Sequence, residues 1–331
     1  MKCPFCDGIA DLKIEPIKIT FRKEDFNIIK QFYKCNKCKE QFTTDDLDEV
    51  NINQVYNQYR EKYQIPFPQQ LIKIRGRYGL SASKMAEVLG FGVNVYRNYE
   101  SGEIPNVSNG TLLNLIRMPE EFKKVILNKK KVFTEKQFNK LVDKLDKLIE
   151  KERSKNYLDK FLLDENSIPN EFSGFSSSSI EKYANMILFF LENNNNLFKV
   201  KLNKLLFYTD FYHFKKTGYS ISGYKYQAIQ NGPVPYRYDL IYDYLWQNEF
   251  IQYELVEIND NLVEQPVPLK KFNEDCFEKS ELDALKTIHE TFKKLTRKEL
   301  VDLSHQEKAW EEQIKHKGVI SYLKYAFNLL L

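Results

Sequence analysis

Apolar residues recur in this chain at two spacings, and the change between them divides it into segments. Near the N-terminus apolar and polar residues alternate, as in Leu12-Lys13-Ile14-Glu15, which predicts short half-buried strands. Beyond residue 66 apolar residues return every three or four positions, as in amphipathic helices. We therefore predict a multidomain, mainly α-helical protein with four segments: a small β domain at 1–48, an all-α domain at 66–128, a helical connector and flexible joint at 129–177, and a mostly helical α+β domain at 178–331.

The second segment has the clearest helix boundaries. Ser81 is expected to cap a helix from 82 to 89, and Gly90 to end it. A helix from 93 to 100 follows, and its start is weakened because Gly92 stands where a Ser or Thr cap is usual. Two more helices are predicted at 69–77 and 111–116. A charged bridge, residues 45–65, precedes them.

The connector is predicted to contain one amphipathic helix and then a joint. Thr134 and Gln137 form a capping box ahead of an apolar stripe at 3-4-3 spacing, made of Phe138, Leu141, Leu145 and Leu148. This stripe packs either on a second copy, which would give a dimer, or on the protein's own core. The serine-rich run at 173–179 predicts a flexible joint.

The last segment is predicted to be mostly helical, with one interruption by strands. Gly232-Pro233-Val234-Pro235 must be a turn or extended, because each proline fixes φ and lacks a donor. Residues 224–229 look strand-like. Helices are predicted at 180–193, 199–216, 236–247, 280–294, 296–303 and 318–330.

Four of the five cysteines form two C-x-x-C pairs, Cys3 with Cys6 and Cys35 with Cys38. Two such pairs can complete a tetrahedral Cys₄ shell for Zn²⁺. Disulfides are the alternative, but nothing else in the chain suggests secretion. With all four positions filled by protein no place remains for a reactive water, so we predict structural zinc in a domain too small to fold on its core alone.

Composition and charge suggest where the protein works. No stretch approaches the about 18 apolar residues of a membrane span, and no signal peptide is visible, so we expect a cytoplasmic protein without a membrane partner. Net charge is +4, yet residues 66–131 hold 11 Lys and Arg against 5 Asp and Glu. This excess of positive charge favours binding of a polyanion there.

The pattern from Leu80 to Gly102 resembles the Xre/Cro-type helix-turn-helix. It comprises Leu80-Ser81, Met85-Ala86, Leu89-Gly90-Phe91, Tyr96, Tyr99-Glu100 and Gly102 at fixed offsets. In such a motif the second helix enters the major groove. The resemblance implies base contacts by Val93, Asn94, Arg97 and Asn98, and phosphate contacts by Ser81, Ser83 and Lys84. Tyr96 and Tyr99 are expected in the core, and Glu100 is expected to tie helix ends together.

Two further resemblances concern larger parts of the chain. A Cys₄ ribbon leading into such a helix-turn-helix is similar to antitoxins of the MqsA type, over about residues 1–125. The C-terminal segment resembles the Panacea domain, the SocA-like antitoxin module. That resemblance rests on the blocks Lys201 to Asp210, Gly218 to Ser222, Ala228 to Pro235 and Leu300 to Trp310, which occur in the order of the family.

These resemblances imply a type II antitoxin that neutralises a cognate toxin by direct binding and represses its own operon. The implied partners are the toxin, operator DNA and a second copy in a homodimer. Tyrosines supply large contact areas, so the predicted toxin-binding surface is Tyr224, Tyr226, Gly232, Pro233, Tyr236 and Tyr238.

Three other readings of the sequence compete with the antitoxin. One is a transcription regulator that senses a ligand or phage factor without a toxin, and another is an adaptor that delivers a client to a protease. The third is an enzyme using His305, Asp210 and His213. No nucleophile, phosphate-binding glycine loop or third metal ligand accompanies these residues, so we expect no catalytic site.

Overall fold

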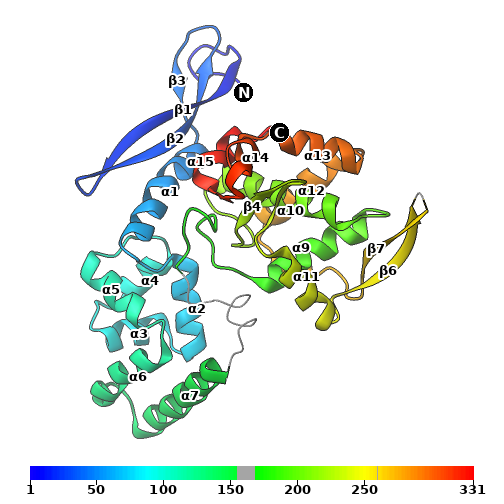
Figure 1. Ribbon diagram of the computed structural model, residues 1–331. Coiled ribbons are helices and arrows are strands. Elements are labelled where there is room, and N and C mark those ends of the chain that lie inside the picture. The colour runs from blue at the N-terminus through cyan, green and yellow to red at the C-terminus, as the bar shows by residue number, and fades with distance from the viewer. Residues whose placement is uncertain (155–167, 259) are drawn as a thin grey trace. The chain divides into compact units, whose positions relative to one another are not determined.

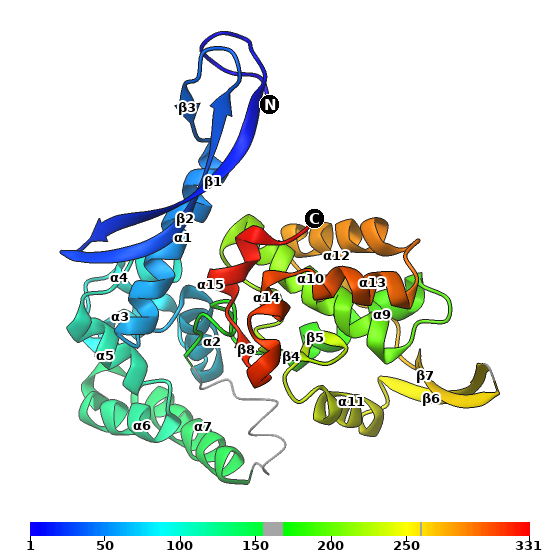
Figure 2. The ribbon, with the colours of Figure 1, turned by 45° about the horizontal axis from the view of Figure 1, so that its top comes forward.

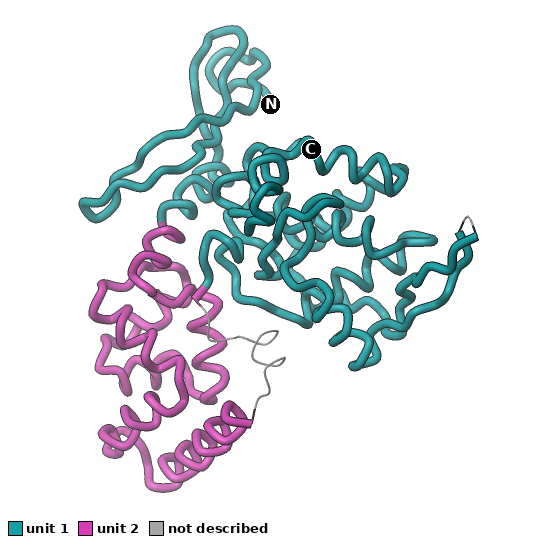
Figure 3. The backbone as a smooth tube through the Cα atoms, in the orientation of Figure 1, with its two compact units in different colours: residues 1–55, 169–331 teal, residues 56–168 magenta. Residues whose placement is uncertain are grey.

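The computed structural model describes residues 1–154, 168–258 and 260–331, in two compact units (Figure 3). One unit combines residues 1–55 with 169–331, and the other comprises 56–168. Helices predominate in both, and the small sheets are antiparallel (Figure 1). The predicted multidomain, mainly α-helical fold is confirmed.

The N-terminal sheet is a long ribbon. β1 (Ala10–Phe21) and β2 (Glu24–Cys35) pair along their whole length, with Ala10 opposite Cys35 and Phe21 opposite Glu24, and the short β3 (Gln41–Phe42) adds to β2. At one end of the ribbon, Cys3 and Cys6 lie in the turn before β1, and Cys35 and Cys38 lie at the end of β2 and in the turn after it. Burial alternates over residues 14–21 of β1 and 24–28 of β2, because successive side chains of a strand point to opposite faces of the sheet.

Residues 45–62 form a helix where the sequence suggested a charged bridge. α1 (Asp45–Lys62) has three aspartates in its first turn and Arg60 and Lys62 in its last, which suits the helix dipole. Its Asn51 side chain accepts from the backbone N–H of Gln31 and donates to the C=O of the same residue, at 2.8 and 2.9 Å. Gln54 does the same to Ile29, at 2.9 Å each. These amides cover the outer edge of β2 as a neighbouring strand would.

Both β2 and α1 are joined to the C-terminal domain within their unit. The side-chain amides of Gln31 and Asn53 donate to the backbone carbonyls of Lys215 and Thr217, at 3.1 and 3.2 Å. Both carbonyls belong to the last turn of α10 (Lys199–Thr217), where a helix leaves its carbonyls without intrahelical partners.

The unit of residues 56–168 is a helical bundle. Its elements are α2 (Pro68–Tyr78), α3 (Ala82–Leu89), α4 (Val95–Glu100), α5 (Val107–Leu115), α6 (Pro119–Asn128), the 3₁₀ turn η1 (Lys130–Val132) and α7 (Glu135–Ser154). Ser81 caps α3 through the N–H of Lys84, and Gly90 ends it, as predicted. The stripe of α7 packs into the same core as α3 and α4, with Leu145 fully buried. It therefore docks on its own bundle and is not available to a second copy.

The C-terminal domain is built around α10, most of whose side chains are buried. α9 (Ile180–Asn193), α12 (Lys279–Phe292) and α13 (Arg297–His305) pack around it (Figure 2). A small sheet has the order β5 (Gly232–Pro235), β4 (Tyr226–Ile229), β8 (Val319–Ile320). The remaining elements are α11 (Tyr238–Gln247), β6 (Ile251–Ile258), β7 (Asn261–Pro268), η2 (Glu274–Cys276), α14 (Lys308–Glu311), η3 (Ile314–His316), α15 (Tyr322–Tyr325) and η4 (Ala326–Asn328).

The serine-rich run at 173–179 is packed, so the prediction of a flexible joint is wrong. Ser220 donates its hydroxyl to the C=O of Ser173 and its N–H to that of Gly174, at 2.7 and 2.8 Å. The hydroxyl of Ser176 donates to Ser220 O at 2.6 Å, and Phe175 is buried. The serine hydroxyls form hydrogen bonds between this run and the loop that contains Ser220. Composition alone does not show whether serines are packed in this way or lie in a flexible linker. Residues 155–167 of the connector lie outside the described residues.

Candidate functional site

The four cysteines predicted to bind metal come together at one end of the N-terminal ribbon. Their sulfur atoms all lie within 4.8 Å of one another, with Cys3 to Cys38 at 3.7 Å and Cys6 to Cys35 at 3.5 Å. A zinc ion with four sulfur ligands at about 2.3 Å would space neighbouring sulfurs about 3.8 Å apart. The thiols are free, so the donor set fits a tetrahedral metal site better than two disulfides.

The backbone around the thiols is shaped for negatively charged sulfur. The N–H groups of Phe5 and Lys37 point at the sulfurs of Cys3 and Cys35, at 3.4 and 3.3 Å. Burial opposes the thiolate of Cys35, but the backbone N–H groups of Cys38 and Lys37 and the neighbouring thiols lower its pKa to about 6. Gly8 is part of the site, because a Cβ there would lie 2.8 Å from the Lys37 Cβ and 3.1 Å from the Cys35 sulfur.

The residues predicted to contact DNA lie at the N-cap of α3, on α3, on α4 and between the two helices. Six are exposed, among them Val93 with 75% of its surface accessible: Ser81, Ser83, Val93, Asn94, Arg97 and Asn98. Lys84 differs, because its ammonium donates to Glu87 and to the backbone C=O of Val132, at 2.7 and 3.0 Å. α4 begins at Val95, later than the predicted residue 93, so Asn94 occupies the N-cap position.

Buried contacts hold α4 in place on the face opposite its exposed residues. The Tyr96 hydroxyl donates to the C=O of Leu71 in α2 at 3.0 Å, and its ring is fully buried, which raises its pKa far above the usual range. Arg75 of α2 donates to the Glu100 carboxylate at 2.6 Å. These contacts confirm that Tyr96 and Tyr99 belong to the core and that Glu100 ties helix ends together.

The predicted toxin-binding residues are mostly inside the C-terminal domain. Tyr224 and Tyr226 are buried among other aromatic rings, and Gly232 and Pro233 are buried in β5. Only Tyr236, 37% exposed, and the half-buried Tyr238 reach the surface. The prediction is corrected accordingly: these four residues build the domain. The ring of Tyr224 packs on Tyr183 of α9, the ring of Tyr226 packs on Phe207 of α10, and β5 lies against α10.

Asp210, on α10, is a buried carboxylate that organises the loop at 219–223. One oxygen accepts from the N–H groups of Ile221 and Ser222 at 2.8 and 2.9 Å. The other accepts from the hydroxyls of Ser222 and Tyr226 at 2.5 and 2.8 Å. Burial raises the pKa of Asp210 to about 6, although these four donors act in the opposite direction. All of its hydrogen bonds serve the fold.

Lys204 is the second buried charge of α10, and it explains the Gly-Pro motif. Its ammonium donates to the C=O of Pro233 at 2.7 Å, and burial lowers its pKa to about 7. Gly232 has φ +93°, and a Cβ there would lie 2.6 Å from the Lys204 side chain and 2.4 Å from the Ser304 hydroxyl. Only glycine allows β5 to approach α10 and α13 this closely.

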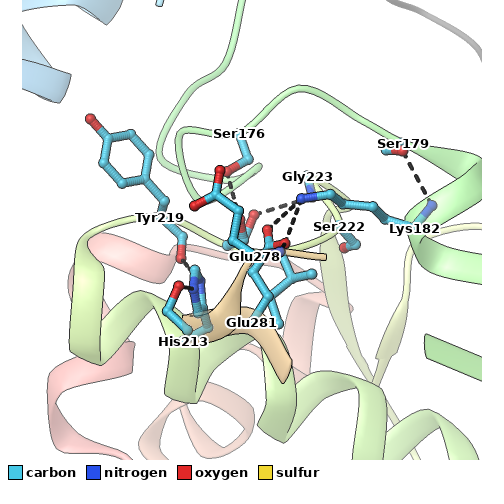
Figure 4. A network of polar contacts seen from close by, with 12 residues as sticks. Ser176, Ser179, Lys182, His213, Tyr219, Ser222, Gly223, Glu278 and Glu281 are labelled. Atoms are coloured by element: carbon cyan, nitrogen blue, oxygen red, sulfur yellow. Dashed lines mark hydrogen bonds and ion pairs between the residues drawn. The ribbon is translucent and has the colours of Figure 1, made fainter. Parts of the chain in front are cut away.

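The two histidines considered for catalysis have different neighbours. His213 contacts the C=O of Tyr219 at 2.7 Å and the hydroxyl of Ser280 at 3.3 Å, and burial lowers its pKa to about 4 (Figure 4). Close by, Lys182 binds both oxygens of Glu281 at 2.5 and 2.6 Å. His305 stacks on Trp310, with ring centroids 4.0 Å apart. The contacts of His213, Lys182 and Glu281 and the stacking of His305 are all made within the C-terminal domain.

Comparisons with known families agree with this division of the chain. Residues 1–126 match the family model of the antitoxin component of bacterial toxin-antitoxin systems, MqsA. Residues 202–311 match the model of the SocA-like antitoxin Panacea domain. Each match covers less than half of the chain, and a comparison with curated proteins finds no match. Both family resemblances seen in the sequence are confirmed, and together they support an antitoxin role. No helix among the described residues is long and apolar enough to cross a membrane.

Proposed function

We propose that this protein is a type II antitoxin with two binding activities. The C-terminal domain binds and neutralises a cognate toxin, and the helical domain of residues 66–128 binds operator DNA as a homodimer and represses the operon. The observation that carries the proposal is the presence of two different antitoxin-family matches in separate parts of one chain, at 1–126 and 202–311.

The arrangement around α4 supports the DNA-binding part. Val93, Asn94, Arg97 and Asn98 are exposed side by side, while Tyr96 and Tyr99 anchor the helix from the opposite face. Arginine pairs with guanine and asparagine with adenine in the major groove, and valine can contact a thymine methyl group. Ser81 and Ser83 are exposed near the start of α3, and in the proposed complex they contact phosphates.

We infer that the four thiols hold Zn²⁺ in a structural role. All four ligand positions would be filled by cysteine, which leaves none for a substrate or a reactive water. The ribbon end around them has only a small cluster of buried residues, Cys3, Ala10 and Cys35, so the metal would supply much of its stability.

The toxin-binding part is tested by growth. Cells expressing the open reading frame adjacent to this gene are compared with and without this protein. We expect toxicity that the full chain relieves, and a stable complex when the two proteins are co-purified. A harmless neighbour that does not bind would refute the antitoxin proposal and favour a ligand-sensing regulator.

The DNA-binding part is tested with the DNA upstream of this gene. Replacing Arg97 and Asn98 by alanine should weaken binding about 10-fold or more in a mobility-shift assay, because each lost base contact costs roughly 1–3 kcal/mol. The matched control replaces Asn139 and Lys140, an exposed amide and cation on α7, and should bind like the wild type. Equal binding by both variants would exclude α4 as the reading helix.

A further inference from the structure

The hairpin formed by β6 and β7 extends away from the helices of the C-terminal domain (Figures 1 and 2). Its two strands form a sheet of their own, with Ile251 opposite Pro268 at the base and Ile258 opposite Asn261 near the tip. Both strands are therefore edge strands, and an isolated two-stranded hairpin is at best marginally stable in water. Some other feature must hold it in place.

The base of the hairpin is anchored to the domain. Ile251 and Pro266 are buried. Lys199, at the start of α10, lies over the ring of Tyr253 at 4.1 Å and pairs with the carboxylate of Glu264 at 3.5 Å. These contacts give the hairpin a defined direction, while Leu255 and Leu262 in its outer half remain largely exposed.

The outer half exposes large apolar side chains. Leu255 and Leu262 are 68% and 70% exposed, and the register places them on the same face as diagonal neighbours. Val256 and Val263 pair directly on the other face, next to the exposed Ile258. Proteins usually protect edge strands with charge, proline or a cover, because exposed apolar edges promote association. Here the apolar groups lie at the part of the hairpin farthest from its base.

The charge of the hairpin identifies the kind of partner. Residues 251–268 contain four acidic residues, Glu254, Glu257, Asp260 and Glu264, and no Lys or Arg, in a chain whose net charge is +4. This negative charge repels nucleic acid and anionic membranes, and it disfavours pairing with the same hairpin of a second copy. It favours a protein surface on which apolar residues are surrounded by Lys and Arg, because interfaces combine an apolar centre with a complementary polar rim.

We propose that the β6–β7 hairpin is the docking element for the toxin, and that the toxin presents an apolar patch flanked by basic residues. The inference rests on the proposed antitoxin function and adds the contact surface and the chemistry of the partner. Leu255 and Leu262 form the centre of the interface, and the glutamates around them orient the partner.

The experiment uses the full chain and the protein encoded by the adjacent open reading frame as the probe. Binding is measured by titration for a variant with Leu255→Ser and Leu262→Ser. Its matched control carries Leu115→Ser and Leu127→Ser, two leucines 50% and 52% exposed on other helices. We expect the hairpin variant to lose about 10-fold or more in affinity and to lose protection in the growth assay, with the control unchanged.

A second pair of variants tests the charge. Glu254→Lys with Glu257→Lys should weaken binding and reduce its dependence on salt, whereas Glu135→Lys with Glu150→Lys on α7 should not. All these positions are exposed, so unchanged circular dichroism is expected for every variant.

The outcomes separate the two proposals. If the wild type binds and protects but the hairpin variants do so equally well, the hairpin proposal is overturned and the antitoxin function stands. If the control variant loses binding instead, the interface lies elsewhere and the proposal also fails. A wild type that neither binds nor protects refutes the function and the hairpin proposal with it. A hairpin variant that only changes the oligomeric state in light scattering would identify a self-interface and overturn the toxin assignment.

Discussion

Replacing Asp210 by alanine should unfold the C-terminal domain more easily, whereas replacing it by asparagine should be tolerated. The carboxylate accepts two backbone N–H groups through one oxygen and two hydroxyls through the other. In the alanine variant the N–H groups of Ile221 and Ser222 stay buried without an acceptor, while both hydroxyls can rotate toward other partners. At about 1–3 kcal/mol for each orphaned donor, the expected loss in the free energy of unfolding is about 2–6 kcal/mol.

Asparagine keeps the acceptor for the two N–H groups, and its NH₂ can donate to the hydroxyls of Ser222 and Tyr226. It also removes a titrating group. The pKa of Asp210 is raised from 3.8 to about 6 by burial, so the carboxyl contributes stability that is complete below about pH 4 and is lost as the pH rises through about 6. The free energy of unfolding of the asparagine variant, relative to wild type, should therefore rise by roughly 2–3 kcal/mol between pH 4 and pH 7.

The measurement is urea unfolding of the full chain, followed by tryptophan fluorescence. Both tryptophans, Trp246 and Trp310, lie in the C-terminal domain, so the signal reports on that domain. His213 has its pKa lowered to about 4 and changes stability with pH in the opposite sense, but it is common to all variants and cancels in the difference. Asp243→Ala, at an exposed site on α11, is the matched control and should change stability by less than about 0.5 kcal/mol.

Two results would refute this reasoning. An alanine variant as stable as the control would mean that the loop at 219–223 does not depend on Asp210. A difference between asparagine variant and wild type that stays constant from pH 4 to pH 7 would mean that the carboxyl does not titrate with a raised pKa.

Three other predictions follow from the structure. Cys35→Ser should abolish zinc binding, measured as metal content after gel filtration. The control Cys276→Ser, outside the cluster, should keep about one equivalent of zinc. Equal metal content in the two variants would exclude the Cys₄ site. Gly232→Ala should lower the free energy of unfolding by about 2 kcal/mol or more, because a Cβ has no room there at φ +93°. The control Gly76→Ala, on the open face of α2, should raise the free energy of unfolding slightly. A neutral Gly232→Ala would contradict the close packing. Asn51→Ala should speed hydrogen exchange at the backbone N–H of Gln31, because the N–H and C=O of Gln31 lose their partner on α1. Unchanged exchange would show that the amide contact does not form in solution.

Helix boundaries were predictable where local residues decide them. Ser81 caps α3 with its own side chain and Gly90 ends it, so the predicted helix of 82–89 agrees with the structure residue by residue. The capping box of Thr134 and Gln137 forms as expected before α7. Such signals depend on neighbours within one turn, and the sequence contains all of them.

Elements stabilised by distant partners were missed. α1 has buried amides along its inner face, so its apolar periodicity is weak, and its partners on β2 lie about 20 residues earlier in the chain. The β6–β7 hairpin was not predicted either, because its register depends on contacts of its base with α10. The serine-rich run resembles a linker in composition, yet Ser220 and Ser222 bind its backbone.

The amino-acid sequence by itself determined the residues of the metal site, the order of the segments and both family resemblances, because each depends on residue types at short, fixed spacings. Only the tertiary structure decided which side chains are available to a partner. In the structure Tyr224 is buried against α9 and Tyr226 against α10, Asp210 and His213 form hydrogen bonds within the domain, and Leu255 and Leu262 are exposed. Exposure depends on packing between residues far apart in the chain, and a tyrosine or leucine has the same local signature in the core and at an interface.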